Sequence, residues 1–62
     1  GDESHAKFAR LPQAAGVLIP EDWRKMSAGG LKELAALLAT PEVANRNEAI
    51  EVVAAELAAR GA

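Results

Sequence analysis

The sequence predicts a small all-α domain, a bundle of two main helices with a short N-terminal helix and an extended arm beside them. Three observations predict this class. Large apolar residues recur three and four positions apart in two segments, which is typical of helices that bury one face. Alanine, the strongest helix former, supplies much of the apolar half of the composition. Each segment also begins with a good capping residue, Ser27 in one and Asn45 in the other.

A chain of 62 residues is long enough for one domain. Residues 1–13 are expected to be a flexible or partly ordered lead-in, and residues 14–62 a single helical domain. Residues 14–19 look extended, because Val17 and Ile19 are β-branched and Ile19 precedes a proline. No other segment has strand character, so we interpret residues 14–19 as an arm that packs across the helices.

Residues 20–26 are expected to form the short helix. Pro20 suits a first helical position, where a backbone N–H is not needed. Trp23 has two interpretations: an anchor of the core, or an exposed platform on which a base or a partner stacks. Phe8 is the only other aromatic residue, so the core needs Trp23 and the first interpretation is favoured.

The middle helix is expected over residues 28–39, after Ser27. Thr40 and Pro41 should end it, and the turn that follows should bring Val43 into the core. Its apolar stripe consists of Leu31, Leu34, Ala35 and Leu38, with Leu37 beside it.

The last helix is expected to open after Asn45, with Glu48 placed as in a capping box, and to end at Arg60 and Gly61. Its apolar face should hold Ile50, Val53 and Leu57, with Ala49, Ala54 and Ala58 beside them. Its acidic side chains, Glu48, Glu51 and Glu56, are expected to face water.

No catalytic, metal or cofactor site is expected. The chain has no Cys and one His, His5, which excludes thiolate and multi-histidine metal sites within one chain. It has no nucleotide-binding or hydrolase motif, and its carboxylates are spread over helix starts and solvent faces. We therefore expect binding rather than catalysis, with no small-molecule substrate. The absence of Cys fits a reducing, cytoplasmic compartment, and no apolar run is long enough to cross a bilayer.

The net charge is −2, whereas domains that bind nucleic acid strongly usually have a basic excess. A local basic surface would therefore be needed. Two predicted helix starts beside basic residues could present N–H groups and cations to phosphates. The basic residues concerned are Arg24, Lys25, Lys32 and Arg46. The alternative is an ordinary solvated face.

From Trp23 to Leu57 the chain resembles the helix–extended loop–helix families: SAP, LEM, the phage-type HeH domains and the Rho N-terminal domain. The matching residues are Ser27, Leu31-Lys32-Glu33-Leu34, Leu38, the loop 40–45, Arg46-Asn47-Glu48-Ala49-Ile50 and Val53. The resemblance implies a compact helical module, a domain of a larger protein, that binds DNA or RNA, or in some members a protein partner, through the helix starts and the loop. The contact residues it implies are Lys32, Asn45, Arg46 and Asn47.

The loop departs from the SAP type, which usually has a glycine and a basic pair before the second helix. Here Glu42 lies in the loop and Arg46 is the one basic residue. The alternative is therefore a protein-interaction or assembly module, for example of a phage or bacterial protein. A surplus of alanines supports that alternative, because small side chains let another helix approach closely: Ala35, Ala36, Ala39, Ala54, Ala55, Ala58 and Ala59.

Overall fold

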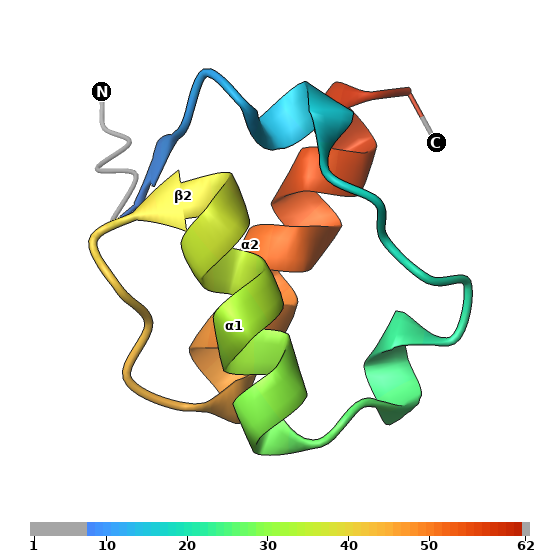
Figure 1. The fold of residues 1–62 in the computed structure, drawn as a ribbon, viewed down its shortest axis with the longest axis vertical. Helices are drawn as coiled ribbons and strands as arrows, with labels where there is room; N and C mark the ends of the chain where they lie inside the picture. The colour runs from blue at the N-terminus through green and yellow to red at the C-terminus, as the bar shows by residue number, and fades with distance from the viewer. Residues whose placement is uncertain (1–7, 62) are drawn as a thin grey trace.

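The computed structural model describes residues 8–61, and most of them lie in or between two parallel helices (Figure 1). The elements, in chain order, are strand β1 (Ala9–Arg10), 3-10 helix η1 (Ala14–Gly16), 3-10 helix η2 (Trp23–Lys25), helix α1 (Ala28–Leu38), strand β2 (Ala39–Thr40) and helix α2 (Arg46–Ala59). The mostly helical class is confirmed, but the prediction of a strictly all-α domain is wrong, because β1 and β2 form a small antiparallel sheet.

Helix α1 begins where the sequence predicts and ends one residue earlier than predicted, at Leu38, because Ala39 belongs to β2. The Ser27 side chain accepts a hydrogen bond from the backbone N–H of Gly30 at 3.2 Å, which satisfies a donor that the helix itself leaves unpaired. After Leu38 the backbone becomes extended. Thr40 precedes a proline, and a residue in that position disfavours the helical conformation. The same effect places Ala39–Thr40 where a strand can pair with them.

Helix α2 is capped by Asn45, whose side chain accepts from the backbone N–H of Glu48 at 2.9 Å. Glu48 Oε1 in turn accepts from the N–H of Ala44 at 2.8 Å. The predicted capping pair therefore forms, with the carboxylate reaching the residue before the cap. At the other end, Arg60 closes the helix and Gly61 has a positive φ of 81°, a conformation that glycine adopts without strain.

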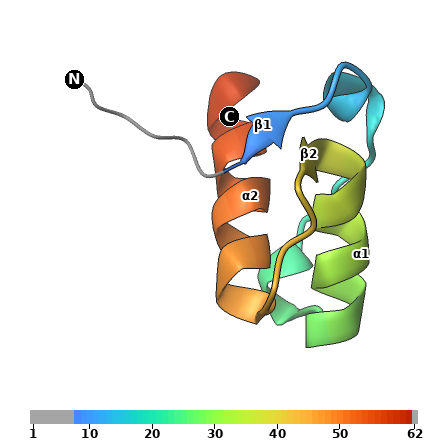
Figure 2. The ribbon, with the colours of Figure 1, turned by 90° about the vertical axis from the view of Figure 1, so that its left-hand side faces the viewer.

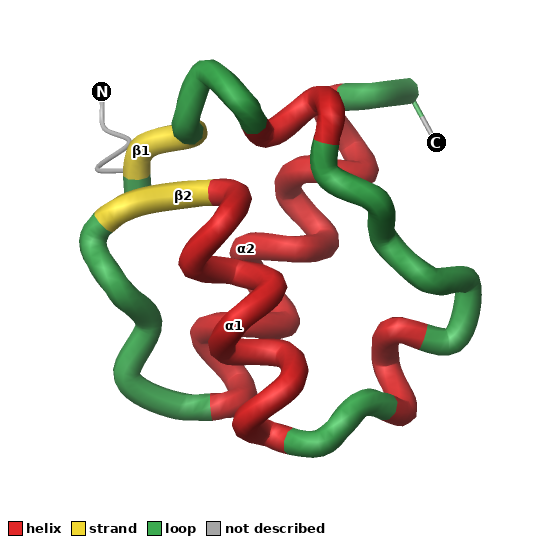
Figure 3. The backbone as a smooth tube through the Cα atoms, in the orientation of Figure 1, coloured by secondary structure: helices red, strands yellow, loops and turns green. Residues whose placement is uncertain are grey.

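The loop 41–45 gives the two helices the same direction. It leaves β2 at one end of the molecule and returns along its side to the opposite end, where α2 starts (Figures 1 and 3). Val43 in this loop is buried, as predicted. Both helices therefore start at one end of the molecule, which we call the amino end, and finish at the other, the carboxyl end (Figure 2).

The core lies along the seam between α1 and α2. Trp23 is 5% exposed, which confirms its interpretation as a core anchor. The predicted stripe of α1 is also buried. The buried apolar residues are Ala14, Trp23, Leu31, Leu34, Ala35, Leu38, Ala39, Val43, Ala49, Val52 and Val53.

The prediction of an extended arm over residues 14–19 is wrong in its first half. Ala14–Gly16 form η1, which follows a turn at Pro12 and Gln13. Alanine favours helical dihedrals, and the N–H groups of Ala14 and Gly16 reach carbonyls three residues back. Of the predicted arm, only Val17 to Ile19 lack helical structure. The short helix predicted over residues 20–26 is likewise reduced to η2 and the turn before it.

The strand partner of β2 comes from the predicted lead-in. Ala9 pairs with Thr40 and Arg10 with Ala39, and the N–H of Leu11 donates to the carbonyl of Leu38 at 2.8 Å. Two-residue strands made of alanine, arginine and threonine carry no alternating apolar pattern, so the pairing left no signal in the sequence. Residues 1–7 of the lead-in lie outside the described residues.

Candidate nucleic-acid interface

The six residues predicted to contact nucleic acid come from three segments that meet at the amino end. Arg24 and Lys25 lie in η2, Lys32 lies one turn into α1, and the others surround the start of α2: Asn45, Arg46 and Asn47. The helices start side by side because the loop 41–45 reverses the chain direction between them (Figures 1 and 2). The positive ends of two helix dipoles therefore point the same way.

Arg46 joins α2 to η2. Its Nη2 donates to the carbonyl of Arg24 at 2.5 Å and its Nε to the carbonyl of Met26 at 3.3 Å. These carbonyls lie at the end of a 3-10 helix, where no further turn uses them. The guanidinium has five N–H donors, so it keeps donors beyond the two bonds that fix it. Arg46 thus fixes η2 against the start of α2 while its charge stays at the surface.

The two asparagines differ in what they can offer a ligand. The Asn45 side-chain oxygen is engaged in the helix cap. Asn47 is exposed, and its side chain makes no hydrogen bond with any other described residue. Asn47 is therefore the better contact candidate of the two, and Asn45 orients the backbone N–H groups of the first turn.

The remaining basic residues also differ. The Arg24 guanidinium lies over the Trp23 ring, 4.6 Å from its centroid, which holds the charge near the end of η2. Lys25 is exposed and Lys32 half-buried, and neither pairs with a carboxylate within residues 8–61. These cations are accordingly open to an anionic partner.

Acidic residues lie close in sequence to these cations. Glu21 and Asp22 precede η2, Glu33 follows Lys32, and Glu42 lies in the loop before α2. These four carboxylates equal in number the basic side chains Arg24, Lys25, Lys32 and Arg46, so attraction of phosphate to the amino end depends on the helix starts as well as on side chains.

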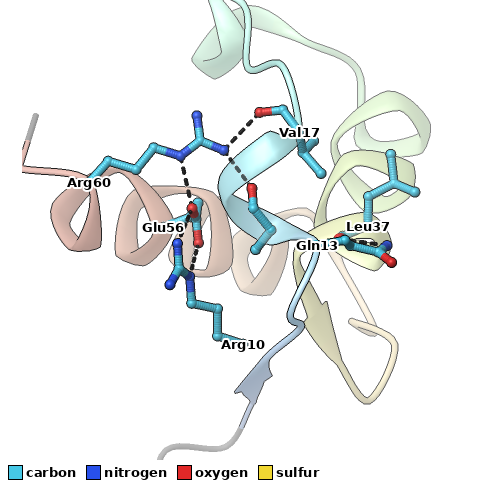
Figure 4. Close-up of polar contacts among 7 residues, drawn as sticks. Arg10, Gln13, Val17, Leu37, Glu56 and Arg60 are labelled. Atoms are coloured by element: carbon cyan, nitrogen blue, oxygen red, sulfur yellow. Dashed lines mark hydrogen bonds and ion pairs between the residues drawn. The ribbon is translucent and has the colours of Figure 1, made fainter.

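A second polar cluster, at the carboxyl end, was missed by the sequence analysis. Glu56 was expected to face water, and that prediction is wrong: the residue is 4% exposed. Its Oε1 accepts from Arg10 Nε at 2.6 Å, and its Oε2 accepts from Arg10 Nη2 at 2.9 Å and from Arg60 Nε at 2.8 Å (Figure 4). Two guanidinium groups satisfy the carboxylate, and the hydrogen bond from Arg10 is the main cause that lowers the pKa of Glu56 from 4.5 to about 2.

The buried face of α2 is rotated accordingly. Ala49, Val52, Val53 and Glu56 are buried, whereas Ile50 and Leu57 are half-buried. The buried face therefore differs from the predicted one, which was centred on Ile50, Val53 and Leu57. It is turned toward the side of α2 that the N-terminal residues cover. The spacing of Glu56 and Arg60, four residues apart on one helix, was the one available signal of their ion pair. Nothing in the sequence pointed to Arg10.

An open apolar groove of about 320 Å³ lies beside this cluster, between β1, β2 and α2. Its walls are formed by Phe8, Arg10, Leu38, Ala39, Glu51, Val52, Ala55 and Glu56. Within residues 8–61 no three His, Cys, Asp or Glu side chains gather in a way that could hold a metal ion, and none of the helices is long and apolar enough to cross a membrane. His5 lies outside the described part.

Comparison with protein-family models, with curated proteins and with solved structures gives no match for this chain. The functional argument therefore rests on the chain's own residues and their arrangement.

Proposed function

We propose that this chain is a non-catalytic binding module of a larger protein, of the helix–extended loop–helix type, that binds DNA or RNA through phosphate contacts at the amino end. The observation that supports the proposal is the parallel arrangement of α1 and α2. It gathers two helix starts and the basic residues Lys25, Lys32 and Arg46 at one end of the molecule. Helix starts with nearby cations are a common way to bind phosphate oxygens.

The proposed binding is weak and not specific for sequence. Each phosphate neutralised by a cation lowers the slope of log K against log salt by about 0.9 for duplex DNA, so three contacts give a slope of about −3. A chain of net charge −2 offers little long-range attraction, so dissociation constants on the order of 10⁻⁴ M are expected at low salt.

The test is an NMR titration of the chain with duplex DNA, and separately with single-stranded RNA, at low salt. Amide shifts should concentrate in residues 24–32 and 44–48. Lys25→Gln and Lys32→Gln should each weaken binding and reduce the salt slope by about one. Thr40→Glu, which changes the charge equally at the exposed carboxyl-end strand, is the matched control and should leave the slope unchanged. Absence of shifts at the amino end with both nucleic acids would reject the proposal.

The alternative is a protein-interaction or assembly module. The observation that favours it is Leu18, whose side chain is 90% exposed on the stretch between η1 and η2. Of the alanines that could let a partner helix approach, Ala36, Ala55, Ala58 and Ala59 are exposed, whereas Ala35 and Ala39 are used inside the core. For self-association, sedimentation equilibrium should show an oligomer that Leu18→Ser weakens. A monomer at high concentration would exclude self-association.

A further inference from the structure

Residues 8–17, which we call the strap, pass over the carboxyl ends of both helices (Figures 1 and 2). The strap contains Phe8, β1, a turn and η1. Besides the two residue pairs of the sheet, the N–H of Leu11 donates to the carbonyl of Leu38, and Gln13 Nε2 donates to the carbonyl of Leu37 at 3.2 Å. These few hydrogen bonds hold the strap to α1 and β2.

The apolar attachment of the strap is small. Ala14 is its only buried residue, and Phe8, Leu11 and Val17 are half-buried. The rest of the chain keeps its own core, since every other buried apolar residue, from Trp23 to Val53, lies outside the strap. Segments with few buried apolar contacts open at lower free energy than the core that they cover.

Glu56 connects the strap to α2 in two ways (Figure 4). It binds Arg10 of β1 directly through both carboxylate oxygens. It also orients Arg60, whose Nη2 donates to the carbonyl of Ala14 at 2.6 Å and of Val17 at 2.7 Å. Within the described residues, all side-chain hydrogen bonds that join the strap to α2 therefore include Glu56 or a guanidinium that it holds.

The strap also forms one wall of the apolar groove. Phe8 and Arg10 line it from the strap, whereas Leu38, Val52 and Ala55 line it from the helices. When the strap leaves, the groove loses that wall and the apolar side chains of the helices become accessible.

We propose that the strap is a releasable cover of the carboxyl end, and that the buried Glu56 carboxylate sets the balance between its closed and open positions. In the closed position Arg10 and Arg60 hold the strap against α2. In the open position α1, α2 and η2 stay folded around Trp23, and the apolar floor of the groove is exposed. This inference does not depend on nucleic-acid binding at the amino end.

The test is amide hydrogen exchange measured by NMR on Glu56→Gln, with Glu51→Gln as the matched control. Glu51 is exposed on the same helix and also borders the groove, but its side chain has no hydrogen-bond partner within the described part. In Glu56→Gln the N–H groups of Leu11 and Val17, which bond to carbonyls of Leu38 and Ala14, should exchange about tenfold faster or more. Amides in the middle of α1 and α2 should keep a higher free energy of opening than the strap amides, and Glu51→Gln should match the wild type.

Strap amides that exchange at the same free energy of opening as amides in the middle of α1 and α2 would overturn the proposal, because the strap would then not open on its own. Unchanged strap amides would overturn it as well. If Glu56→Gln loses its core, seen as exposure of Trp23 in fluorescence, Arg10→Gln decides the matter. The Arg10 side chain is half-exposed and binds only at the carboxyl end, so its loss should speed exchange at Leu11 while Trp23 stays buried. Loss of the core in both variants would also contradict the proposal.

Discussion

At each end of α2 an arginine binds the carbonyls of a 3-10 helix, yet the two ends differ in charge. At the amino end, Arg46 donates to the carbonyls of Arg24 and Met26 and so holds η2. At the carboxyl end, Arg60 donates to the carbonyls of Ala14 and Val17 and so holds η1. Arg46 satisfies two carbonyls that η2 leaves without a partner, and Arg60 satisfies that of Val17 and adds a second bond to that of Ala14, which already accepts from the N–H of Val17.

The difference lies in the carboxylate. Arg60 pairs with Glu56, which also pairs with Arg10, so one carboxylate partly offsets the charge of two guanidinium groups at the carboxyl end. Within residues 8–61 Arg46 has no such ion pair, and it lies at the positive end of the helix dipole. Arg60 therefore only stabilises the position of η1. Arg46 stabilises the position of η2 and keeps a charge that an anion can bind. The following predictions test this contrast, from the largest expected effect to the smallest.

Acid should affect the carboxyl end most, because it removes the charge that both Arg10 and Arg60 bind. The pKa of Glu56 is lowered from 4.5 to about 2 on folding. Its contribution to stability is therefore fully present above pH 4.5, and it decreases as the pH falls from 4.5 to about 2. The free energy of unfolding of the wild type should exceed that of Glu56→Gln most above pH 4.5. Urea titrations across this range measure that difference, and one that stayed constant down to pH 2 would contradict the assignment.

Removing each arginine should give unequal losses. Arg60→Met leaves a buried carboxylate with one partner and removes a bond from the carbonyls of Ala14 and Val17, of which Ala14 keeps the N–H of Val17, so the free energy of unfolding should fall by about 2 kcal/mol. Arg46→Met leaves two carbonyls unpaired but no buried charge, and these carbonyls lie near enough to solvent to bind water. The free energy of unfolding should therefore fall by about 1 kcal/mol. Urea denaturation at pH 7 measures both values. A larger loss for Arg46→Met would mean that the amino end depends on its arginine more than the carboxyl end does.

The smallest effects are expected at the helix caps of the amino end. Asn45→Ala and Ser27→Ala should each lower the free energy of unfolding by about 1 kcal/mol or less, since each removes one side-chain bond to a backbone N–H. The bond at Asn45 is the shorter, 2.9 Å against 3.2 Å, so its loss should be the greater. Thermal unfolding of the two variants checks the order. A reversed order would show that the glycines after Ser27 make its cap the more important one.

Local chemistry made much of the fold predictable. Ser27 and Asn45 cap their helices, Leu31, Leu34 and Leu38 form the buried stripe of α1, and Val43 enters the core from the loop. These features depend on residues within one or two turns of each other, so periodicity and capping rules reach them. The residues of the candidate interface were predicted from the same kind of signal, because helix starts are marked in the sequence.

The features that were missed depend on residues far apart in the chain. Glu56 meets Arg10 across 46 positions, and β1 pairs with β2 through two residues that have no strand pattern. A glutamate among alanines looks like a solvent-facing residue until another segment covers it. The rotation of the buried face of α2 toward Glu56 follows from that cover.

The sequence by itself determined where the two helices begin and end, which residues of α1 are buried, and that Trp23 belongs to the core, because each depends on backbone propensity or on apolar spacing within a segment. Only the tertiary structure decided that the helices run parallel, that their starts and cations share one end, and that a buried carboxylate holds the strap at the other. These features need the loop and the strap to come back along the helices, and close approach of distant segments leaves no periodic mark in a chain.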